Sequence, residues 1–315
     1  MRKTVSRFPA VLVQILGPTG VGKSRISLRL ARDFNAEVIS ADSMQVYRGF
    51  NIGTDKLAVQ ERQGVPHHLI DIVDDCSQFN AARFMDESFV LAQEIRARGR
   101  LPLVCGGTAL YLRTMIRGIF PQSNHCRMER RILQRLAAQQ GLGLLWRRLQ
   151  QVDPEYGRGV SPRDSIRIIR ALEIYYNHGS PPSKVFRQTR TPFREYRFIR
   201  IGLTMERLRL YERIEERIDH MLQRGLVDEV RRLRLRYPPD CPPFQALGYR
   251  EIADYLDGKR DWTETVGLIK CHSRQFAKRQ LTWFRQEQDI KWFSPEDGEG
   301  VTAWLRLRLE ENQDG

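Results

Sequence analysis

The sequence predicts an α/β protein with a parallel sheet core, an inserted all-helical lobe and a helical C-terminal region. Three observations support this fold class. Short apolar runs separated by helical patterns recur in the first part of the chain, a central stretch holds helical patterns alone, and helical patterns dominate after residue 203. Because parallel strands are buried on both faces and need long crossover connections, apolar runs separated by helices indicate a parallel sheet.

Apolar segments predict the strands of the core. They occupy residues 11–16, 37–41, 101–105 and 197–203. A helical pattern at residues 23–34 joins the first two of them. These elements predict a core domain built from residues 1–120 and 191–315.

The stretch at residues 121–190 breaks this alternation. Helical patterns cover residues 128–140, 144–152 and 165–177, and no convincing strand separates them. We therefore predict a helical insertion at residues 121–190.

A second helical region follows the last predicted strand. Six residues recur at helical spacing and form one stripe, which we expect to pack against the core: Leu208, Tyr211, Ile214, Ile218, Met221 and Leu222. Gly225 interrupts the pattern, and Tyr237 with the two prolines after it ends the helical region.

Composition excludes several classes of protein. The chain has 315 residues, of which 41% are hydrophobic and 29% charged, and it lacks an apolar run long enough to cross a membrane. The basic N-terminus runs into an apolar segment without a cleavage site, which we interpret as a buried strand rather than a signal peptide. We therefore expect a cytoplasmic protein without a membrane partner.

Cysteine and histidine spacing argues against a structural metal site. Five cysteines, at positions 76, 105, 126, 241 and 271, are an odd number without C-x-x-C spacing. They predict reduced thiols rather than a disulfide framework or a zinc site. The adjacent His67 and His68 would point apart on a strand, which favours ordinary turn or core histidines.

The positive charge is concentrated in two regions. The formal net charge is +14; residues 121–190 hold 13 Lys and Arg against 5 Asp and Glu, and residues 267–287 hold 5 against 1. Each Lys or Arg that neutralises a phosphate releases a condensed counterion, so such regions favour a polyanion partner. A merely solvated basic surface remains the alternative.

A phosphate-binding loop follows the first predicted strand. Its eight residues match G-x-x-x-x-G-K-S/T and directly precede a helical pattern: Gly17, Pro18, Thr19, Gly20, Val21, Gly22, Lys23 and Ser24. Glycines let the backbone amides face phosphate oxygens, the lysine adds a charge, and the serine hydroxyl is a Mg²⁺ ligand. The motif predicts a P-loop NTPase-like core, and a nucleoside triphosphate or another pyrophosphate would satisfy it equally.

Two polar residues follow other predicted strands. Asp42 comes directly after residues 37–41, and Thr108 follows the strand at 101–105 through Gly106 and Gly107. Ligands of open parallel sheets bind beyond the carboxyl ends of the strands, so both side chains should face the phosphate loop. Asp42 is then a candidate general base or water-mediated Mg²⁺ ligand, with a turn cap as the alternative. The glycine pair fits either close approach of a ligand or a plain turn.

The sequence resembles the tRNA dimethylallyltransferases, also called tRNA isopentenyltransferases, over nearly its whole length. Seven blocks carry the resemblance in order: the phosphate loop, residues 39–47 (ISADSMQVY), 66–71 (PHHLID), 106–108 (GGT), 167–173 (RIIRALE), 248–251 (GYRE) and 278–283 (KRQLTW). The second block beside a phosphate loop is the most specific of them.

The resemblance implies a reaction and its catalytic residues. The phosphate loop would hold the diphosphate of dimethylallyl diphosphate rather than ATP, and the acceptor would be the N6 amine of the adenine 3′-adjacent to the anticodon of a tRNA. Asp42 matches the family's general base, and Thr108 a hydrogen-bond partner of the acceptor nucleotide. Lys23, a Mg²⁺ ion at Ser24, and Arg217, within the R-I-x-x-R-I-D pattern at residues 213–219, would stabilise the released diphosphate.

The resemblance also implies contacts with the tRNA anticodon stem-loop. The matching positions are Asp42, Ser43, Met44, Gln45, Ile166, Arg167, Ile168, Ile169, Arg170, Ala246, Leu247, Gly248, Tyr249, Arg250, Glu251, Gln280, Leu281, Thr282, Trp283, Phe284, Arg285, Gln286 and Glu287. Ile166 stands where the family usually has Gln, and Arg83 where it has Asp, so these two positions depart from the family pattern. We expect the protein to act as a monomer.

Two other functions remain open at this stage. A small-molecule kinase would explain the phosphate loop and the α/β core, but it would not need the basic insertion or the Lys270, Arg274 and Lys278 series at one-turn spacing. A non-catalytic, nucleotide-dependent RNA-binding protein would need both basic regions but no general base.

Overall fold

The computed structural model describes residues 10–74, 76–120 and 126–311, apart from the side chains of residues 126 and 127. The chain divides into two compact units. One consists of Met1–Ile116 and Pro192–Gly315, and the other of Arg117–Thr191. These boundaries lie close to those predicted for the core, at residues 1–120 and 191–315, and for the insertion at residues 121–190.

The first unit is built on a six-stranded parallel sheet with the strand order β3-β2-β4-β1-β5-β6. The strands are β1 (Ala10–Leu16), β2 (Ala36–Ser40), β3 (His67–His68), β4 (Leu101–Gly106), β5 (Tyr196–Leu203) and β6 (Ile290–Phe293). The predicted α/β class is confirmed. The sequence did not reveal β3 and β6, which are the short edge strands and are only partly buried, so they lack a continuous apolar pattern.

Register in the sheet brings the functional loops together. Leu16, the last residue of β1, pairs with Gly106 of β4 and with Gly202 of β5. β2 pairs with β4 up to Ser40 opposite Cys105. The segments that follow β1, β2 and β4 therefore leave the sheet at the same edge, which is where ligands bind in open parallel sheets.

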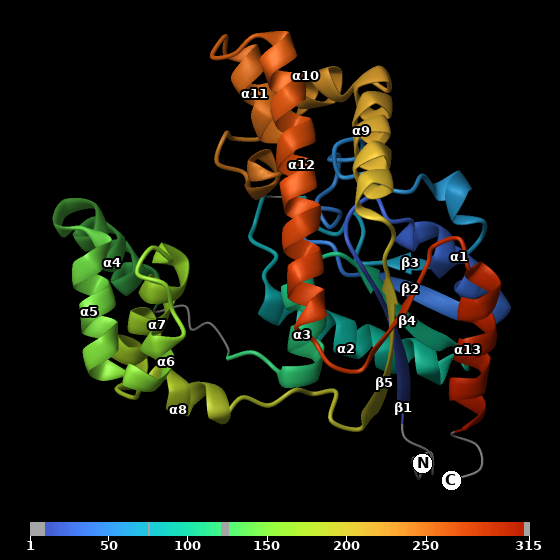
Figure 1. The fold of residues 1–315 in the computed structure, drawn as a ribbon, viewed down its shortest axis with the longest axis horizontal. Helices are drawn as coiled ribbons and strands as arrows, with labels where there is room; N and C mark the ends of the chain where they lie inside the picture. Colours follow the sequence, from blue (N-terminus) through green and yellow to red (C-terminus); the bar gives the residue numbers. More distant parts are fainter. Residues whose placement is uncertain (1–9, 75, 121–125, 312–315) are drawn as a thin grey trace. The chain divides into compact units, whose positions relative to one another are not determined.

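Helices cover both faces of the sheet. Figure 1 shows α1 (Lys23–Asp33) and α13 (Gly298–Glu310) on one face, and α2 (Ala81–Ala97) and α3 (Ala109–Arg117) on the other. The strands are buried from both sides, and β2 is buried along its whole length. This explains why the central strands are continuous apolar runs rather than alternating ones.

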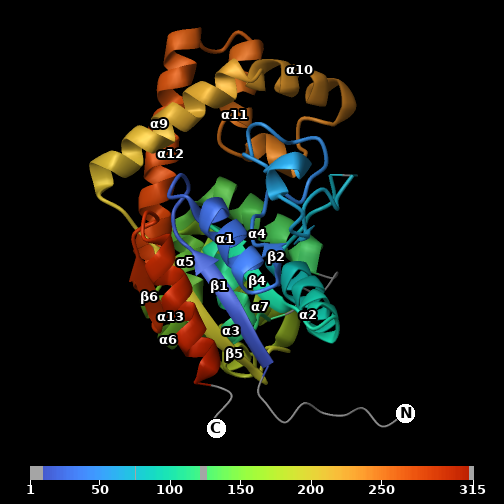
Figure 2. The same ribbon diagram turned by 90° about the vertical axis from the view of Figure 1, so that its right-hand side faces the viewer.

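Four helices and two 3₁₀ turns complete this unit. The helices are α9 (Arg207–Gln223), α10 (Leu226–Arg236), α11 (Tyr249–Leu256) and α12 (Trp262–Arg285), and the turns are η1 (Val59–Arg62) and η2 (Pro242–Gln245). Figure 2 shows α9, α10, α11 and α12 above the sheet in that view. In α9 the predicted stripe is confirmed at Ile214, Ile218 and Met221, which are buried. Leu208 is 69% exposed and does not belong to the stripe, and Leu210, which was not predicted, is buried instead.

In its described residues the second unit contains helices and no strand, as the sequence predicted. It contains α4 (Cys126–Gln140), α5 (Leu142–Val152), α6 (Pro154–Arg158), α7 (Ser165–His178) and α8 (Pro182–Arg187). Leu133, Leu149, Ile168 and Leu172 form the centre of its own apolar core. Asp153 caps α6 and also accepts a hydrogen bond from the Ser183 amide, which ties α8 to the bundle. We call this unit the helical lobe.

The prediction of reduced cysteines was wrong for one pair. Cys76 and Cys241 form a disulfide between positions 165 residues apart in the sequence. Cys105 and Cys271 are free thiols, and the side chain of Cys126 lies outside the described residues. Sequence spacing missed the bridge because the fold, not the local chain, brings the two positions together.

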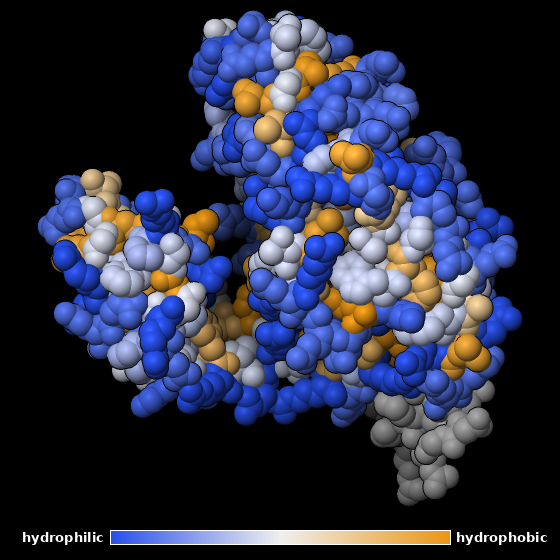
Figure 3. Space-filling view, in the orientation of Figure 1, coloured by the Kyte–Doolittle hydropathy of each residue, from blue (hydrophilic) through white to orange (hydrophobic). Residues whose placement is uncertain are grey.

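In the part of the chain that the structure describes, no helix has the length and apolarity needed to cross a membrane. Figure 3 shows hydrophilic residues over most of the visible face, with apolar residues in small groups.

In β3, the His68 Nε2 atom lies 2.6 Å from the Glu37 carboxylate, and the His67 Nδ1 atom lies 2.9 Å from the Val65 carbonyl oxygen. Both histidines thus have structural partners.

Candidate functional site

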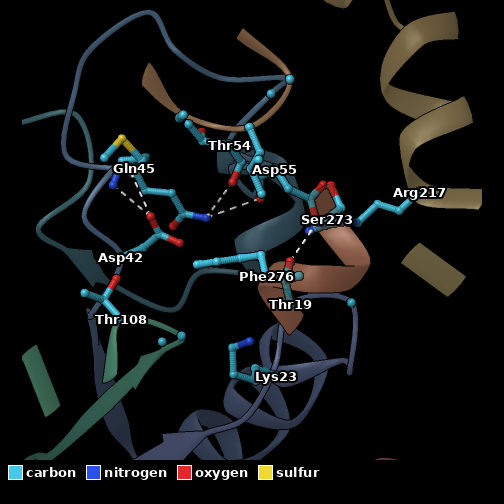
Figure 4. Close-up of a pocket in the computed structure, with 18 of the residues that line it drawn as sticks. Thr19, Lys23, Asp42, Gln45, Thr54, Asp55, Thr108, Arg217, Ser273 and Phe276 are labelled. Atoms are coloured by element: carbon cyan, nitrogen blue, oxygen red, sulfur yellow. Dashed lines mark hydrogen bonds and ion pairs between the residues drawn. The ribbon is translucent and has the colours of Figure 1, made fainter. Parts of the chain in front are cut away.

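A cavity of about 770 Å³ lies at the carboxyl edge of the sheet, within the first unit. The phosphate loop, the segment after β2, residues 53–57, the end of β4, α9 and α12 all contribute to its lining. Figure 4 shows Asp42 and Thr108 together on one side of this cavity and Arg217 on the other. The tertiary structure thus unites all three residues predicted to be catalytic.

The phosphate loop connects β1 to α1 as predicted. Gly22 caps the N-terminus of α1 in the left-handed region, at φ 101°, a conformation that glycine adopts without strain. The Lys23 ammonium group donates hydrogen bonds to the carbonyl oxygens of Gly17 and Pro18, at 3.0 and 2.7 Å. Desolvation by burial lowers the pKa of Lys23 to about 8, with Arg217 acting in the same direction and Asp42 against it. Ser24 lines the same cavity.

Asp42 is both a turn cap and a cavity residue. Its Oδ1 atom accepts hydrogen bonds from the amides of Met44, at 2.8 Å, and Gln45, at 3.3 Å. Among the described residues, no hydrogen bond reaches its Oδ2 atom. The capped turn therefore fixes the side chain while one carboxylate oxygen stays available for a ligand.

Thr108 belongs to the same side of the cavity. Its Oγ1 atom accepts a hydrogen bond from the Ser43 amide at 3.1 Å, which links the end of β4 to the turn after β2. The glycine pair before it packs against protein. A Cβ atom on Gly106 would lie 2.2 Å from the Ala41 carbonyl oxygen, and one on Gly107 would lie 2.4 Å from Gln280 Nε2. These glycines serve close packing at the strand end.

Arg217 reaches the phosphate loop from α9. Its Nη2 atom donates to Thr19 Oγ1 at 2.7 Å, and its Nη1 atom lies 3.0 Å from Asp55 Oδ2. The Nε atom is buried and has no hydrogen-bond partner among the described residues. Asp55 lies outside every motif recognised in the sequence, so its role was not predicted.

Gln280 of α12 has a structural role that the sequence did not reveal. Its Oε1 atom accepts from the Thr19 amide and its Nε2 atom donates to the Gly107 carbonyl oxygen, both at 2.8 Å. The side chain is buried. It therefore ties the phosphate loop to the end of β4. Gln280 also lines the cavity, and its contact with RNA stays a prediction.

The other positions predicted to contact tRNA in the first unit fall into three groups. Seven line the cavity: Ser43, Met44, Gln45, Ala246, Leu247, Gly248 and Arg250. Tyr249, Glu251 and Phe284 are buried instead and belong to the interior of the unit. Near the end of α12, Arg113 lies over the Trp283 ring at 3.6 Å and pairs with Glu287, while Leu281 is partly exposed and Thr282, Arg285 and Gln286 are exposed.

The predicted tRNA positions of the helical lobe also divide by burial. Ile166, which is 74% exposed, and Arg167 are at the surface. Ile168 and Ile169 belong to the apolar core of the lobe, and Arg170 pairs with the buried Glu173. Contact with RNA remains a prediction for the exposed side chains, whereas the two buried isoleucines hold the lobe together.

No carboxylate or thiolate cage for a metal ion is present in the described residues, since they contain no group of three or more His, Cys, Asp or Glu side chains suited to one. The two candidates from the sequence, the Ser24 hydroxyl and the Asp42 carboxylate, both line the cavity. This sparse set fits Mg²⁺, which takes most of its ligands from phosphate and water.

Comparison with known proteins assigns the chain to a family. The family model described as IPP transferase matches residues 45–287. A tRNA dimethylallyltransferase of Symbiobacterium thermophilum is 47% identical over 285 residues, which is 89% of this chain and 88% of the relative. A tRNA dimethylallyltransferase of Geobacillus thermodenitrificans is 44% identical over 311 residues, which is 96% of this chain and 98% of the relative.

Solved structures agree with this assignment. The full-length tRNA isopentenylpyrophosphate transferase from Bacillus halodurans is 41% identical and aligns with a TM-score of 0.72 over 96% of this chain and 98% of its own. A eukaryotic dimethylallyltransferase acting on tRNA is 32% identical, with a TM-score of 0.78 over 91% of this chain and 74% of its own. By sequence and by fold, the chain belongs to the IPP transferase family.

Proposed function

We propose that the protein transfers a dimethylallyl group from dimethylallyl diphosphate to the N6 amine of the adenine 3′-adjacent to the anticodon in tRNA, releasing diphosphate. The observation that carries the proposal is the position of Asp42 and Thr108, which line the same cavity as the phosphate loop and Arg217. A base and an anion-binding loop that share a cavity suit transfer from a diphosphate to a nitrogen nucleophile.

The donor's diphosphate would bind the phosphate loop. Lys23 contacts only carbonyl oxygens of its own loop there, and the Nε atom of Arg217 is buried without a partner in the described residues. Both donors would gain an acceptor from the diphosphate oxygens. A Mg²⁺ ion at Ser24 would supply further neutralisation of the anion.

The acceptor would meet the carboxylate on the opposite side. The lone pair of an adenine amine is delocalised into the ring, so loss of a proton during attack assists the reaction. The N6 nitrogen forms a bond to C1 of the dimethylallyl group, the C1–O bond breaks, and its electron pair leaves with the diphosphate. The proton passes to the Oδ2 atom of Asp42, while the Thr108 hydroxyl orients the adenine by a hydrogen bond. Lys23 and Arg217 stabilise the charge that develops on the diphosphate.

The cavity also suits the size of the reactants. Ligand pockets typically enclose about 300 to 1,000 Å³, and the cavity of about 770 Å³ has room for a five-carbon diphosphate together with one extruded base. Loop bases are easier to unstack than bases in a duplex, which suits an adenine beside an anticodon. The Lys and Arg residues of the helical lobe would bind the phosphates of the anticodon stem-loop.

The alternatives considered from the sequence are not favoured by membership of the IPP transferase family. Neither a small-molecule kinase nor a non-catalytic RNA-binding protein would account for the relationship to relatives named tRNA dimethylallyltransferase. Monomeric action in the cytoplasm stays a prediction.

Incubation of the protein with unmodified tRNA, dimethylallyl diphosphate and Mg²⁺, without ATP, tests the proposal. Mass analysis of the digested nucleosides should show dimethylallyl adenosine, and a tRNA with guanine in place of that adenine should give none. Modification that requires ATP, or phosphate transferred to the acceptor, would overturn the proposal.

A further inference from the structure

A buried carboxylate of α10 holds the loop at residues 50–55, which we call the 50–55 loop. Glu229 is 3% exposed, and its two carboxylate oxygens accept hydrogen bonds from three successive amides, those of Asn51, Ile52 and Gly53, at 2.8 to 3.3 Å. Amides that converge on one anion fix the local backbone, because each bond is charge-assisted and shielded from water.

Tyr249 of α11 completes this arrangement. Its hydroxyl donates to Glu229 Oε1 at 2.6 Å and accepts from the Gly53 amide at 3.1 Å. Glycine is required at position 53 because a Cβ atom there would lie 2.5 Å from the Tyr249 ring. Phe50, at the start of the loop, packs against Tyr249 with the ring centroids 5.2 Å apart. The loop is therefore fixed from α10 and α11 by both polar and apolar contacts.

The far end of the 50–55 loop enters the functional site. Asp55 lies 3.0 Å from Arg217, which in turn donates to Thr19 of the phosphate loop. The carbonyl oxygens of Thr54 and Asp55 accept from Gln45 Nε2 at 3.1 and 3.4 Å. The Gln45 amide is one of the two that donate hydrogen bonds to the Asp42 carboxylate. One loop thus contacts the neighbours of both the leaving-group site and the base (Figure 4).

We propose that Glu229, assisted by Tyr249, is a positioning residue for the transfer reaction: it sets the 50–55 loop so that Asp55 holds Arg217 over the phosphate loop. The inference rests on the proposed function for the reaction it serves. Glu229 does not line the cavity, so its effect must pass through the loop. An arginine displaced by a fraction of an ångström stabilises a leaving diphosphate less well.

Glu229→Gln is the decisive substitution, and Tyr249→Phe is the milder one. Glutamine preserves the shape but directs an NH₂ group at backbone N–H groups, so at least one amide loses its acceptor. We expect Glu229→Gln to lower kcat/KM for dimethylallyl diphosphate by about tenfold to 100-fold, while the KM for tRNA changes less than about threefold. Asp228→Asn, on an exposed neighbour in the same helix, is the matched control and should leave both constants unchanged.

A double-mutant cycle with Arg217→Ala separates positioning from a general structural role. If Glu229 acts through Arg217, Glu229→Gln should cost little further activity in the Arg217→Ala background. Full additivity, or an equal rise in the KM for both substrates, would overturn the proposal. Should Glu229→Gln lower the melting temperature too far for assay, Tyr249→Phe in the same cycle decides the question.

Calorimetric titration with Mg²⁺ and pyrophosphate, without tRNA, distinguishes this inference from the proposed function. Weaker pyrophosphate binding by Glu229→Gln than by wild type is expected even if no tRNA product forms, in which case the proposed function alone fails. Product formation by wild type combined with unchanged constants in Glu229→Gln and Tyr249→Phe rejects the positioning role alone.

Discussion

The guanidinium of Arg217 and the hydroxyl of Thr19 lie 2.7 Å apart although 198 positions separate them in the sequence. This contact brings the middle of α9 onto the phosphate loop and places a cation beside that loop. In the proposed reaction, the loop would bind the diphosphate, and residues from distant elements would provide the remaining charge and the base.

Asp42→Asn should lower turnover by about 10² to 10⁴ while the affinity for tRNA changes little. Asparagine retains a side-chain oxygen for the amides of Met44 and Gln45, so the turn persists while the proton acceptor is lost. Single-turnover rates and filter binding of tRNA measure the two effects separately. Near-normal turnover in this variant would reject Asp42 as the base.

Affinity for the donor should weaken as the pH rises above about 8. Burial lowers the pKa of Lys23 to about 8, so the ammonium group that pairs with diphosphate is lost in the empty site above this value. The Kd of Mg²⁺ pyrophosphate, measured by calorimetry between pH 7 and pH 9.5, should rise through this range. In Lys23→Ala binding should be weak throughout and the rise should disappear. A pH dependence that survives in the variant would assign the titration to another group.

The lowered pKa of Lys23 also predicts how stability changes with pH. Because its pKa in the folded protein lies below that of a free lysine, the unfolded chain binds more protons between pH 8 and 10.5. The contribution of Lys23 to the free energy of unfolding is therefore unfavourable below pH 8 and improves as the pH rises through this window. Denaturant unfolding of wild type and Lys23→Met at pH 7 and pH 9.5 should show Lys23→Met to be the more stable at pH 7, with a smaller difference at pH 9.5.

Charge reversal at Arg130 and Arg131 of the helical lobe should weaken tRNA binding and flatten its dependence on salt. Each lost phosphate contact reduces the slope of log K against log salt by about one. Reversal at Arg306 and Arg308 of α13, on a face of the sheet, is the matched control and should leave the slope unchanged. An unaltered slope in the lobe variant would show that the lobe does not bind the tRNA backbone.

Reduction of the Cys76–Cys241 disulfide should destabilise the first unit. The bridge spans 165 positions, and loss of a native disulfide typically costs about 2 to 5 kcal/mol through the entropy of the unfolded chain. Cys76→Ser should show this loss in denaturant unfolding and should make stability insensitive to dithiothreitol. Cys271→Ser, which removes a free thiol, should behave as wild type. Equal stability of oxidised and reduced wild type would contradict the prediction.

Much of the architecture followed from local patterns. The helices of the lobe, the stripe of α9 and the four central strands were predicted because burial imposes a period on neighbouring residues. The edge strands β3 and β6 were missed because a half-exposed strand of two or four residues carries no such period. Leu208 was placed wrongly on the α9 stripe because spacing alone does not show where burial begins.

The sequence by itself determined which functional groups are present: a phosphate-binding loop motif, a carboxylate and a hydroxyl after two strands, and basic helical regions. These are properties of short segments, set by neighbouring residues. Only the tertiary structure decided which groups meet: Asp55 with Arg217, Gln280 with Thr19, Glu229 with the 50–55 loop, and Cys76 with Cys241. Such pairs depend on how whole helices pack against the sheet. Because packing energy is distributed over many residues, no short motif predicts these pairs.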